Sequence, residues 1–382
     1  MKFTRAWMVV GATSLAVAST AGAIVPTAAP ATAGTGIPER AVSLPSGQLF
    51  GVAATSTHNA WAVGQVSSSG KTIILRWNGT AWARVPSPTP AGGGALYAVT
   101  ATSASNAWAV GGSGTPPGKT QILHWNGSTW KQVPSPTPSD GGALFGVAAT
   151  SASNAWAVGC AGNCFQGFGG IKTLILHWNG TAWKRVPSPS PAQNSSLSSV
   201  AAVSAHSAWA VGCTALCFLS STSPQTVILQ WNGSTWKRVA SPAQARVGAL
   251  NGVAATSASN AWAVGCSGHC FGPMATTRTM AMHWNGSAWK YVASPSPAPD
   301  SVLTAVAATS AGNAWAVGYT RTSFKTLIEH WNGTAWKKVP SPTPGQLSQL
   351  LGVAATSASN AWAVGSDENH LILQHWNGTS WR

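Results

Sequence analysis

Three Cys-x-x-x-Cys-Phe motifs hold the residues of this sequence that are best suited to covalent chemistry. All six cysteines lie in them, as Cys160 and Cys164, Cys213 and Cys217, and Cys266 and Cys270. An even count favours disulfides in an oxidising compartment, and we expect each pair to close on itself. Bridges between motifs are the alternative. Zinc is disfavoured because the spacing is not Cys-x-x-Cys, so we expect neither a metal nor another cofactor.

Aromatic and basic side chains surround these motifs and predict a binding surface. Sugars are held by aromatic stacking and a few placed polar groups, and both kinds of residue are present here. Alternatively, the phenylalanines pack down over their own loops. The candidate binding residues are Phe165, Phe168, Phe218, His269, Phe271, Tyr319 and Arg321.

Candidate catalytic groups are few. The acids are Glu39, Asp140, Asp300, Glu329, Asp367 and Glu368. Glycoside hydrolysis needs two carboxylates within about 10 Å, and four of these acids fall in predicted loops: Asp140, Asp300, Asp367 and Glu368. Five histidines each directly precede a tryptophan, which predicts structural polar residues rather than bases or ligands: His124, His177, His283, His330 and His375. We therefore predict no catalytic residue.

Seven copies of a tryptophan-rich unit position all of these residues. The first tryptophan of each copy stands in Asn/Ser-Ala-Trp-Ala-Val-Gly, and successive copies are 47, 48, 53, 53, 53 and 47 residues apart. Each copy ends in Trp-Asn-Gly-Ser/Thr-x-Trp. The copies begin near residues 48, 95, 143, 196, 249, 302 and 349. A fixed period in this range predicts a propeller or a solenoid.

Each copy predicts four short strands. In the third copy, apolar and small residues alternate over 144–149, 154–159, 173–178 and 181–186. Asn179-Gly180 predicts a two-residue type I′ turn that pairs Leu176 with Trp183 and points both hairpin tryptophans the same way. Proline then ends the sheet. Seven such units predict an all-β, seven-bladed propeller of four-stranded antiparallel blades. A β-helix is the weaker alternative.

The second copy resembles a kelch repeat. Residues 107–112 read Ala-Trp-Ala-Val-Gly-Gly, and residues 124–136 read His-Trp-Asn-Gly-Ser-Thr-Trp-Lys-Gln-Val-Pro-Ser-Pro. The chain is thus similar to kelch-like, galactose-oxidase-like propellers and to tryptophan-rich repeats of secreted actinobacterial proteins without an assigned function. The resemblance implies either a copper oxidase or a pure binding module. It also implies that an N-terminal strand closes the ring, and residues 40–45 match the piece absent from the last copy.

Loop lengths divide the propeller into two rims. The Ser/Thr-rich first turn and the Asn-Gly turn share one rim and hardly change. The second loop and the blade-to-blade connection share the other, the variable rim. Its second loops contain seven, eight, 13, 13, 13, seven and five residues, and the long ones carry the cysteines. Binding is usually placed on such loops.

The first 33 residues predict a secretory signal peptide. Lys2 and Arg5 precede an apolar run, and Ala-x-Ala sites end at Ala23 and Ala33. We favour cleavage after Ala33, which gives a propeller domain at 34–382. No other stretch approaches the 18 apolar residues of a membrane span. We therefore expect a secreted, extracellular monomer without a membrane anchor.

The domain is strongly basic. Without the signal, 19 basic and six acidic residues remain, a net charge of +13. Ten basic residues follow the last tryptophan of a copy, where lysine blocks pairing at a sheet edge. No nucleic-acid motif accompanies them, so we expect no specific nucleic-acid binding. The charge still favours anionic partners.

We predict a secreted, non-enzymatic binding propeller that engages carbohydrate or an anionic cell-wall polymer through the variable rim. One alternative is a secreted carbohydrate-active enzyme that uses carboxylates of this rim. Another is a purely structural surface protein.

Overall fold

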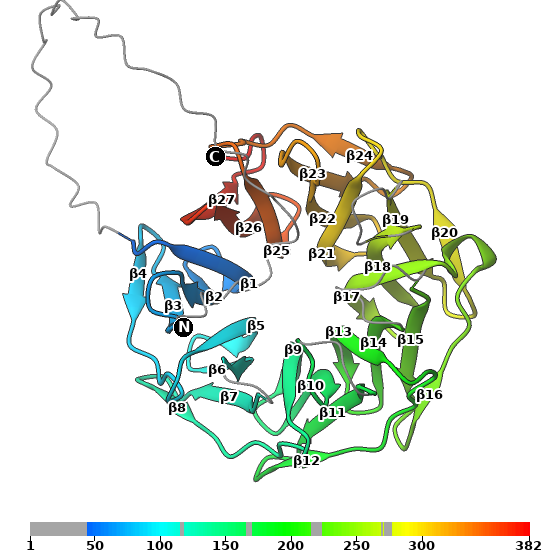
Figure 1. The fold of residues 1–382 in the computed structure, drawn as a ribbon. Coiled ribbons are helices and arrows are strands. Elements are labelled where there is room, and N and C mark those ends of the chain that lie inside the picture. The colour runs from blue at the N-terminus through cyan, green and yellow to red at the C-terminus, as the bar shows by residue number, and fades with distance from the viewer. Residues whose placement is uncertain (1–43, 115–117, 166–169, 215–223, 269, 271–276) are drawn as a thin grey trace, which may run out of the picture. The chain divides into compact units, whose positions relative to one another are not determined.

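Seven antiparallel sheets surround a common axis in the computed structural model, with the first strand of each repeat nearest the axis (Figure 1). The structure describes residues 44–114, 118–165, 170–214, 224–268, 270 and 277–382. We number the sheets as blades 1–7 in chain order. Six contain four strands, and in the seventh a Trp376–Trp381 bridge starts the fourth. The predicted all-β, seven-bladed propeller is thus confirmed.

The strands shorten from the axis outward. The first strands are β1 (Gly47–Ser56), β5 (Gly94–Ser103), β9 (Gly142–Ser151), β13 (Ser195–Ser204), β17 (Gly248–Ser257), β21 (Ser301–Ser310) and β25 (Ser348–Ser357). The second are β2 (Asn59–Val66), β6 (Asn106–Ser113), β10 (Asn154–Ala161), β14 (Ser207–Thr214), β18 (Asn260–Ser267), β22 (Asn313–Thr320) and β26 (Asn360–Asp367). The third are β3 (Thr72–Trp77), β7 (Thr120–Trp125), β11 (Lys172–Trp178), β15 (Thr226–Trp231), β19 (Arg278–Trp284), β23 (Thr326–Trp331) and β27 (His370–Trp376). The outer strands are β4 (Trp82–Val85), β8 (Trp130–Gln132), β12 (Trp183–Arg185), β16 (Trp236–Arg238), β20 (Trp289–Val292) and β24 (Trp336–Val339), and a short 3-10 helix, η1 (Ala243–Ala245), follows β16.

Alternation along the second strand explains how blades stack. In β10, Trp156 and Val158 pack against blade 4, whereas Ala155 and Ala157 pack against Trp108 of blade 2. Large side chains on one face therefore meet small ones on the next blade, which lets neighbouring sheets approach closely.

A cluster of three tryptophans, which we call a Trp triad, joins every pair of neighbouring blades. The second-strand tryptophan of one blade contacts the two hairpin tryptophans of the next, with ring centroids 4.7–4.9 Å and 5.0–5.2 Å apart. Tilted and edge-to-face pairs of this kind contribute about 0.5–1.5 kcal/mol beyond the area that they bury.

The seventh triad closes the ring. Trp362 of blade 7 contacts Trp77 and Trp82 of blade 1, and the Gly47 amide donates a 2.6 Å hydrogen bond to the Asn369 carbonyl. Leu44 packs into the same interface. Residues 39–43 lie outside the described residues, so closure by an N-terminal strand stays a prediction.

The Asn-Gly hairpin differs from the predicted register. Trp178 pairs with Trp183, and Leu176 pairs with Arg185 rather than with Trp183. The turn is longer because the Asn179 side-chain oxygen accepts hydrogen bonds from the backbone amides of Thr181 and Ala182, while Gly180 takes a φ of +94°. The shift is two residues, so both tryptophans still point the same way, as predicted.

Candidate functional site

The constant rim is formed by the first turn and the hairpin turn of each blade. In blade 3 the Trp178 indole N–H donates to the carbonyl of Ala152 in the first turn, and Gly180 lies against Ser153. The equivalent indole bond, 2.9–3.1 Å long, is present in all seven blades. The two turns therefore brace each other, which leaves this rim little freedom to vary.

The five repeated histidines are structural, as predicted. His177 stacks on Trp156 with centroids 4.2 Å apart and bonds the Asn154 amide oxygen at 2.8 Å, while the Asn154 amide nitrogen donates to Thr150. Burial lowers the pKa of the ring. The other four make the same contacts: His124, His283, His330 and His375.

The variable rim contains one irregular residue in each inner strand. Every first strand carries a β-bulge directly after a buried leucine, near the end where the connection enters the blade. A bulged residue leaves the ladder, so its side chain is free of the sheet's alternation. All seven are partly exposed, and we call them the bulge ring: Phe50, Tyr97, Phe145, Ser198, Asn251, Thr304 and Leu351.

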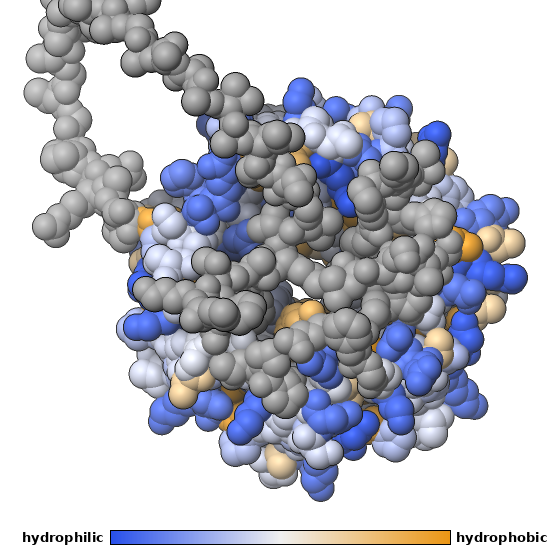
Figure 2. Space-filling model, in the orientation of Figure 1, coloured by the Kyte–Doolittle hydropathy of each residue, from blue (hydrophilic) through white to orange (hydrophobic). Residues whose placement is uncertain are grey.

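Aromatic residues occupy the first three positions of the bulge ring. Phe50 and Tyr97 have centroids 5.3 Å apart, and Tyr97 and Phe145 are 5.4 Å apart. Phe165, from the second loop of blade 3, adds contacts of 6.3 Å to Tyr97 and 6.0 Å to Phe145. We call these four residues the aromatic arc. Apolar surface is visible near the centre of the ring (Figure 2).

Polar residues follow in blades 4–6. The Asn251 amide donates to the Leu303 carbonyl at 2.8 Å, and the Thr304 hydroxyl donates to the Leu350 carbonyl at 2.7 Å. Each of these bonds reaches the inner strand of the next blade. The bulge ring is therefore apolar on one side and supplies amide and hydroxyl groups on the other.

Sequence analysis missed Phe50, Tyr97 and Phe145 as candidate site residues. A usable signal existed, because the residue after the leucine is the one that changes most within an otherwise repeated first strand. Burial raises the pKa of Tyr97, although the residue as a whole is partly exposed, so the part of it that faces solvent is the ring rather than the hydroxyl.

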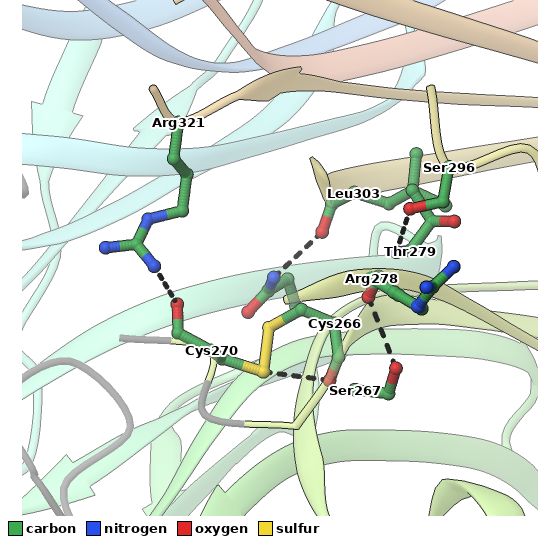
Figure 3. Close-up of a disulfide and its surroundings, with 9 residues drawn as sticks. Cys266, Ser267, Cys270, Arg278, Thr279, Ser296, Leu303 and Arg321 are labelled. Atoms are coloured by element: carbon green, nitrogen blue, oxygen red, sulfur yellow. Dashed lines mark hydrogen bonds between the residues drawn. A yellow bond between two sulfur atoms is a disulfide. The ribbon is translucent and has the colours of Figure 1, made fainter. Parts of the chain in front are cut away.

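Two of the three predicted disulfides are present. Cys160 bonds Cys164 beside Phe145 and Phe165, and Cys266 bonds Cys270. Cys213 is also disulfide-bonded, but Cys217 lies outside the described residues. The Arg321 guanidinium of blade 6 donates to the Cys270 carbonyl at 3.0 Å, so this blade holds the stapled loop of blade 5 (Figure 3).

The predicted binding residues are distributed unevenly. Phe165 belongs to the aromatic arc. Tyr319 is only 7% exposed, packs beside Cys266 and Cys270, and stacks on Phe324. It lies in β22, whose face is covered by the neighbouring loop. Four candidates lie outside the described residues: Phe168, Phe218, His269 and Phe271.

Carboxylates of the variable rim take part in loop structure. Asp300 accepts a hydrogen bond from the Thr322 amide, and Asp367 accepts one from the Leu347 amide at 3.1 Å. Glu329 lies between blades 5 and 6, fully buried, and accepts a bond from Ser294 at 2.8 Å. Burial raises its pKa to about 8. Within the described ranges, no group of three or more His, Cys, Asp or Glu residues is placed to hold a metal ion.

The fold is shared with solved structures of unlike sequence. No protein-family model and no curated protein matches the sequence. YCF48 bound to D1 peptide has a TM-score of 0.54 and 13% identity, covering 87% of this chain and 94% of that one. An ulvan lyase bound to -[GlcA(1-4)Rha3S]- has a TM-score of 0.57 and 11% identity, covering 88% and 96%. A fucose-specific lectin from Aleuria aurantia has a TM-score of 0.50 and 11% identity, also covering 88% and 96%. These likenesses establish the seven-bladed β-propeller fold and no closer kinship.

Proposed function

We propose that this protein is a secreted, non-enzymatic propeller that binds carbohydrate through the variable rim, at the aromatic arc. The observation that carries the proposal is the contact of Phe50, Tyr97, Phe145 and Phe165 at partly exposed positions of the innermost strands and an adjoining loop. Aromatic faces pack on the C–H face of a sugar. An anionic wall polymer fits the same rim through the positive charge of the domain.

Neighbouring folds support a glycan more than any other ligand. The Aleuria aurantia protein is a fucose-specific lectin, and the ulvan lyase is a polysaccharide lyase. YCF48, in contrast, is seen with a peptide. Proteins of this fold with unlike sequences thus include a lectin and a polysaccharide lyase.

Secretion belongs to the same proposal. Two disulfides are compatible with an extracellular protein, and none of the described helices is long and apolar enough to cross a membrane. The signal peptide, the kelch-like type and the monomeric state are inferences from sequence. We place catalysis second, because Asp300 and Asp367 already accept backbone hydrogen bonds.

A glycan and wall-polymer array on residues 34–382 tests the proposal. The double variant Phe50→Ala/Tyr97→Ala should weaken binding to the array hit at least tenfold, about 1.4 kcal/mol. The control is Tyr291→Ala, which removes a 39% exposed ring from outer strand β20 and should bind normally. Both proteins should melt within a few degrees of the parent, because these rings are partly exposed.

Three results would count against the proposal. Unchanged binding by the double variant moves the site away from the aromatic arc. Absence of any glycan or wall-polymer hit removes the carbohydrate class. Shortened or unsaturated products from the hit polymer would make the protein an enzyme and favour the carboxylate alternative.

A further inference from the structure

Blade 1 carries a groove of about 800 Å³ on the variable rim, away from the aromatic arc. Its wall consists of the segment that enters β3 and the connection that leaves β4. Exposed Lys71 and Arg84 line it together with hydroxyl groups and proline rings: Ser69, Ser87, Thr89, Pro86 and Pro90. No carboxylate lines this groove.

Blade 2 repeats the groove at the equivalent place, with a volume of about 530 Å³. Lys119 takes the place of Lys71, Gln132 that of Arg84, and Pro138 that of Pro90. Pro90 lines both grooves, so they adjoin across one connection. No carboxylate lines the second groove either.

The groove walls are fixed by hydrogen bonds beneath them. The Thr72 hydroxyl bonds the hydroxyls of Ser87 and Thr89 at 3.1 and 2.8 Å. Thr120 does the same with Ser135 and Thr137 at 2.7 Å each. The connections are therefore held in place before any ligand arrives, which reduces the entropy cost of binding.

Gln121 is a buried polar residue in the second groove, and its bond to the connection of the preceding blade is repeated by Gln374 with Pro342 in blade 7. Six other copies place an aliphatic side chain or methionine at this position. Gln121 is only 1% exposed, its amide nitrogen donates to the Pro88 carbonyl at 3.2 Å, and its amide oxygen has no partner among the described residues. An unpaired buried acceptor costs about 1–3 kcal/mol, so Gln121 is costly to keep at a position where the other copies are apolar.

Edge protection does not account for the two lysines. Lys71 and Lys119 stand at the entrance of third strands, not on the outer strands β4 and β8. Their positive charge lines a hollow with hydroxyl, amide and proline neighbours. Lysine and arginine in such a setting favour a carboxylate, sulfate or phosphate.

We propose that the adjoining grooves of blades 1 and 2 form a second site, for a linear polymer that carries repeated anionic groups and hydroxyls. Lys71, Arg84 and Lys119 would bind the anionic groups, and Gln121 would accept a bond from a hydroxyl. An acidic glycan and a polyol phosphate share this chemistry. A nucleic acid is disfavoured, because the lining residues offer no aromatic ring for base stacking.

Binding of defined polymers to residues 34–382 tests the site. The probes are polygalacturonate, a poly(glycerol phosphate) teichoic acid, neutral dextran and single-stranded DNA, each at 50 and 300 mM NaCl. We expect one acidic polymer to bind with a Kd that rises with salt, and dextran not to bind. The polymer that binds more tightly identifies the anionic group.

Matched variants separate the grooves from general charge. Lys71→Gln/Arg84→Gln/Lys119→Gln should raise the Kd at least tenfold. The control Lys172→Gln/Arg185→Gln/Lys237→Gln removes the same charge from blades 3 and 4 and should change it less than threefold. Gln121→Leu, which copies the other blades, should weaken binding at both salt concentrations and should not lower the melting temperature.

Three results would overturn the proposed second site or its ligand class. Equal loss in both triple variants would show a diffuse cationic surface and overturn the site. Absence of binding to either acidic polymer, or equally tight binding to DNA, would overturn the ligand class. The aromatic arc is intact in every variant, so binding to the array hit of the first proposal reports separately on that site.

Discussion

The Trp triads and the bulge ring both recur around the propeller, yet the residue types of the triads are constant and those of the bulge ring vary. All seven triads contain the same three tryptophans, whereas the seven bulge positions hold six residue types. The second-strand tryptophans are 0–3% exposed at interfaces, and the bulged residues are partly exposed and off the ladder. Positions with the same residue in every copy are therefore those that blade packing determines. Positions that vary between copies are those that packing leaves free for a ligand.

Removing one triad should produce the largest effect. Trp156→Ala leaves a cavity between blades 3 and 4 and should destabilise the protein by about 3–5 kcal/mol. Thermal unfolding followed by circular dichroism should show a fall of roughly 10 °C in Tm. Tyr97→Ala is the matched truncation in the bulge ring and should cost less than half as much. Equal losses of stability in the two variants would show that the bulge ring contributes as much to packing as the triads.

Glu329 allows the effect of one buried ionisable residue on the stability of a blade interface to be measured. Its pKa, raised to about 8 by burial, means that the folded protein keeps a proton that the unfolded chain loses above about pH 4.5. Stability is fully present below that pH and is lost as the pH rises towards 8. Glu329→Gln, which copies Gln374 of blade 7, should add up to about 3 kcal/mol at pH 7.

Urea unfolding at two pH values measures this gain. It should be present at pH 7.5 and almost absent at pH 4.5, where the carboxyl is protonated in the folded protein and about half protonated in the unfolded chain. An equal gain at both pH values would assign the effect to packing instead of to the buried charge.

The repeated histidines predict a smaller effect of opposite sign. Burial lowers the pKa of His177 and its four equivalents below 6.5, so the unfolded chain takes up protons first as the pH falls. Stability is therefore present above pH 6.5 and declines below it. Replacing His124 and His177 by Gln, as in Gln230 of blade 4, should flatten the decline of Tm between pH 6.5 and 5. An unaltered slope would show that other groups dominate acid unfolding.

Much of the fold could be predicted because the same sequence pattern recurs in all seven copies. The Trp spacing gave the blades, the Asn-Gly pairs located the hairpins, and the cysteine spacing gave the two stapled loops that the structure describes. The histidines were recognised as structural for the same reason. Regular recurrence is a reliable signal of packing, since each copy faces the same neighbours.

The candidate site could be predicted far less well. A bulge depends on how two strands pair, so no single copy separates Phe50 or Phe145 from a buried strand residue, and the signal emerges only when the seven copies are compared. The Asn179 side chain lengthened the hairpin, which a two-residue rule could not foresee. Tyr319 is covered by a loop from another blade, and burial by distant segments is not written in local sequence.

The seventh triad gives the ring no preferred starting point. Trp362 meets Trp77 and Trp82 as closely as any neighbours in sequence meet, so the triad that joins the last blade to the first matches the other six. A circular permutant opened at a turn of the constant rim would keep every triad. Duplication or exchange of whole repeats would therefore change the residues of the variable rim and leave the Trp triads intact.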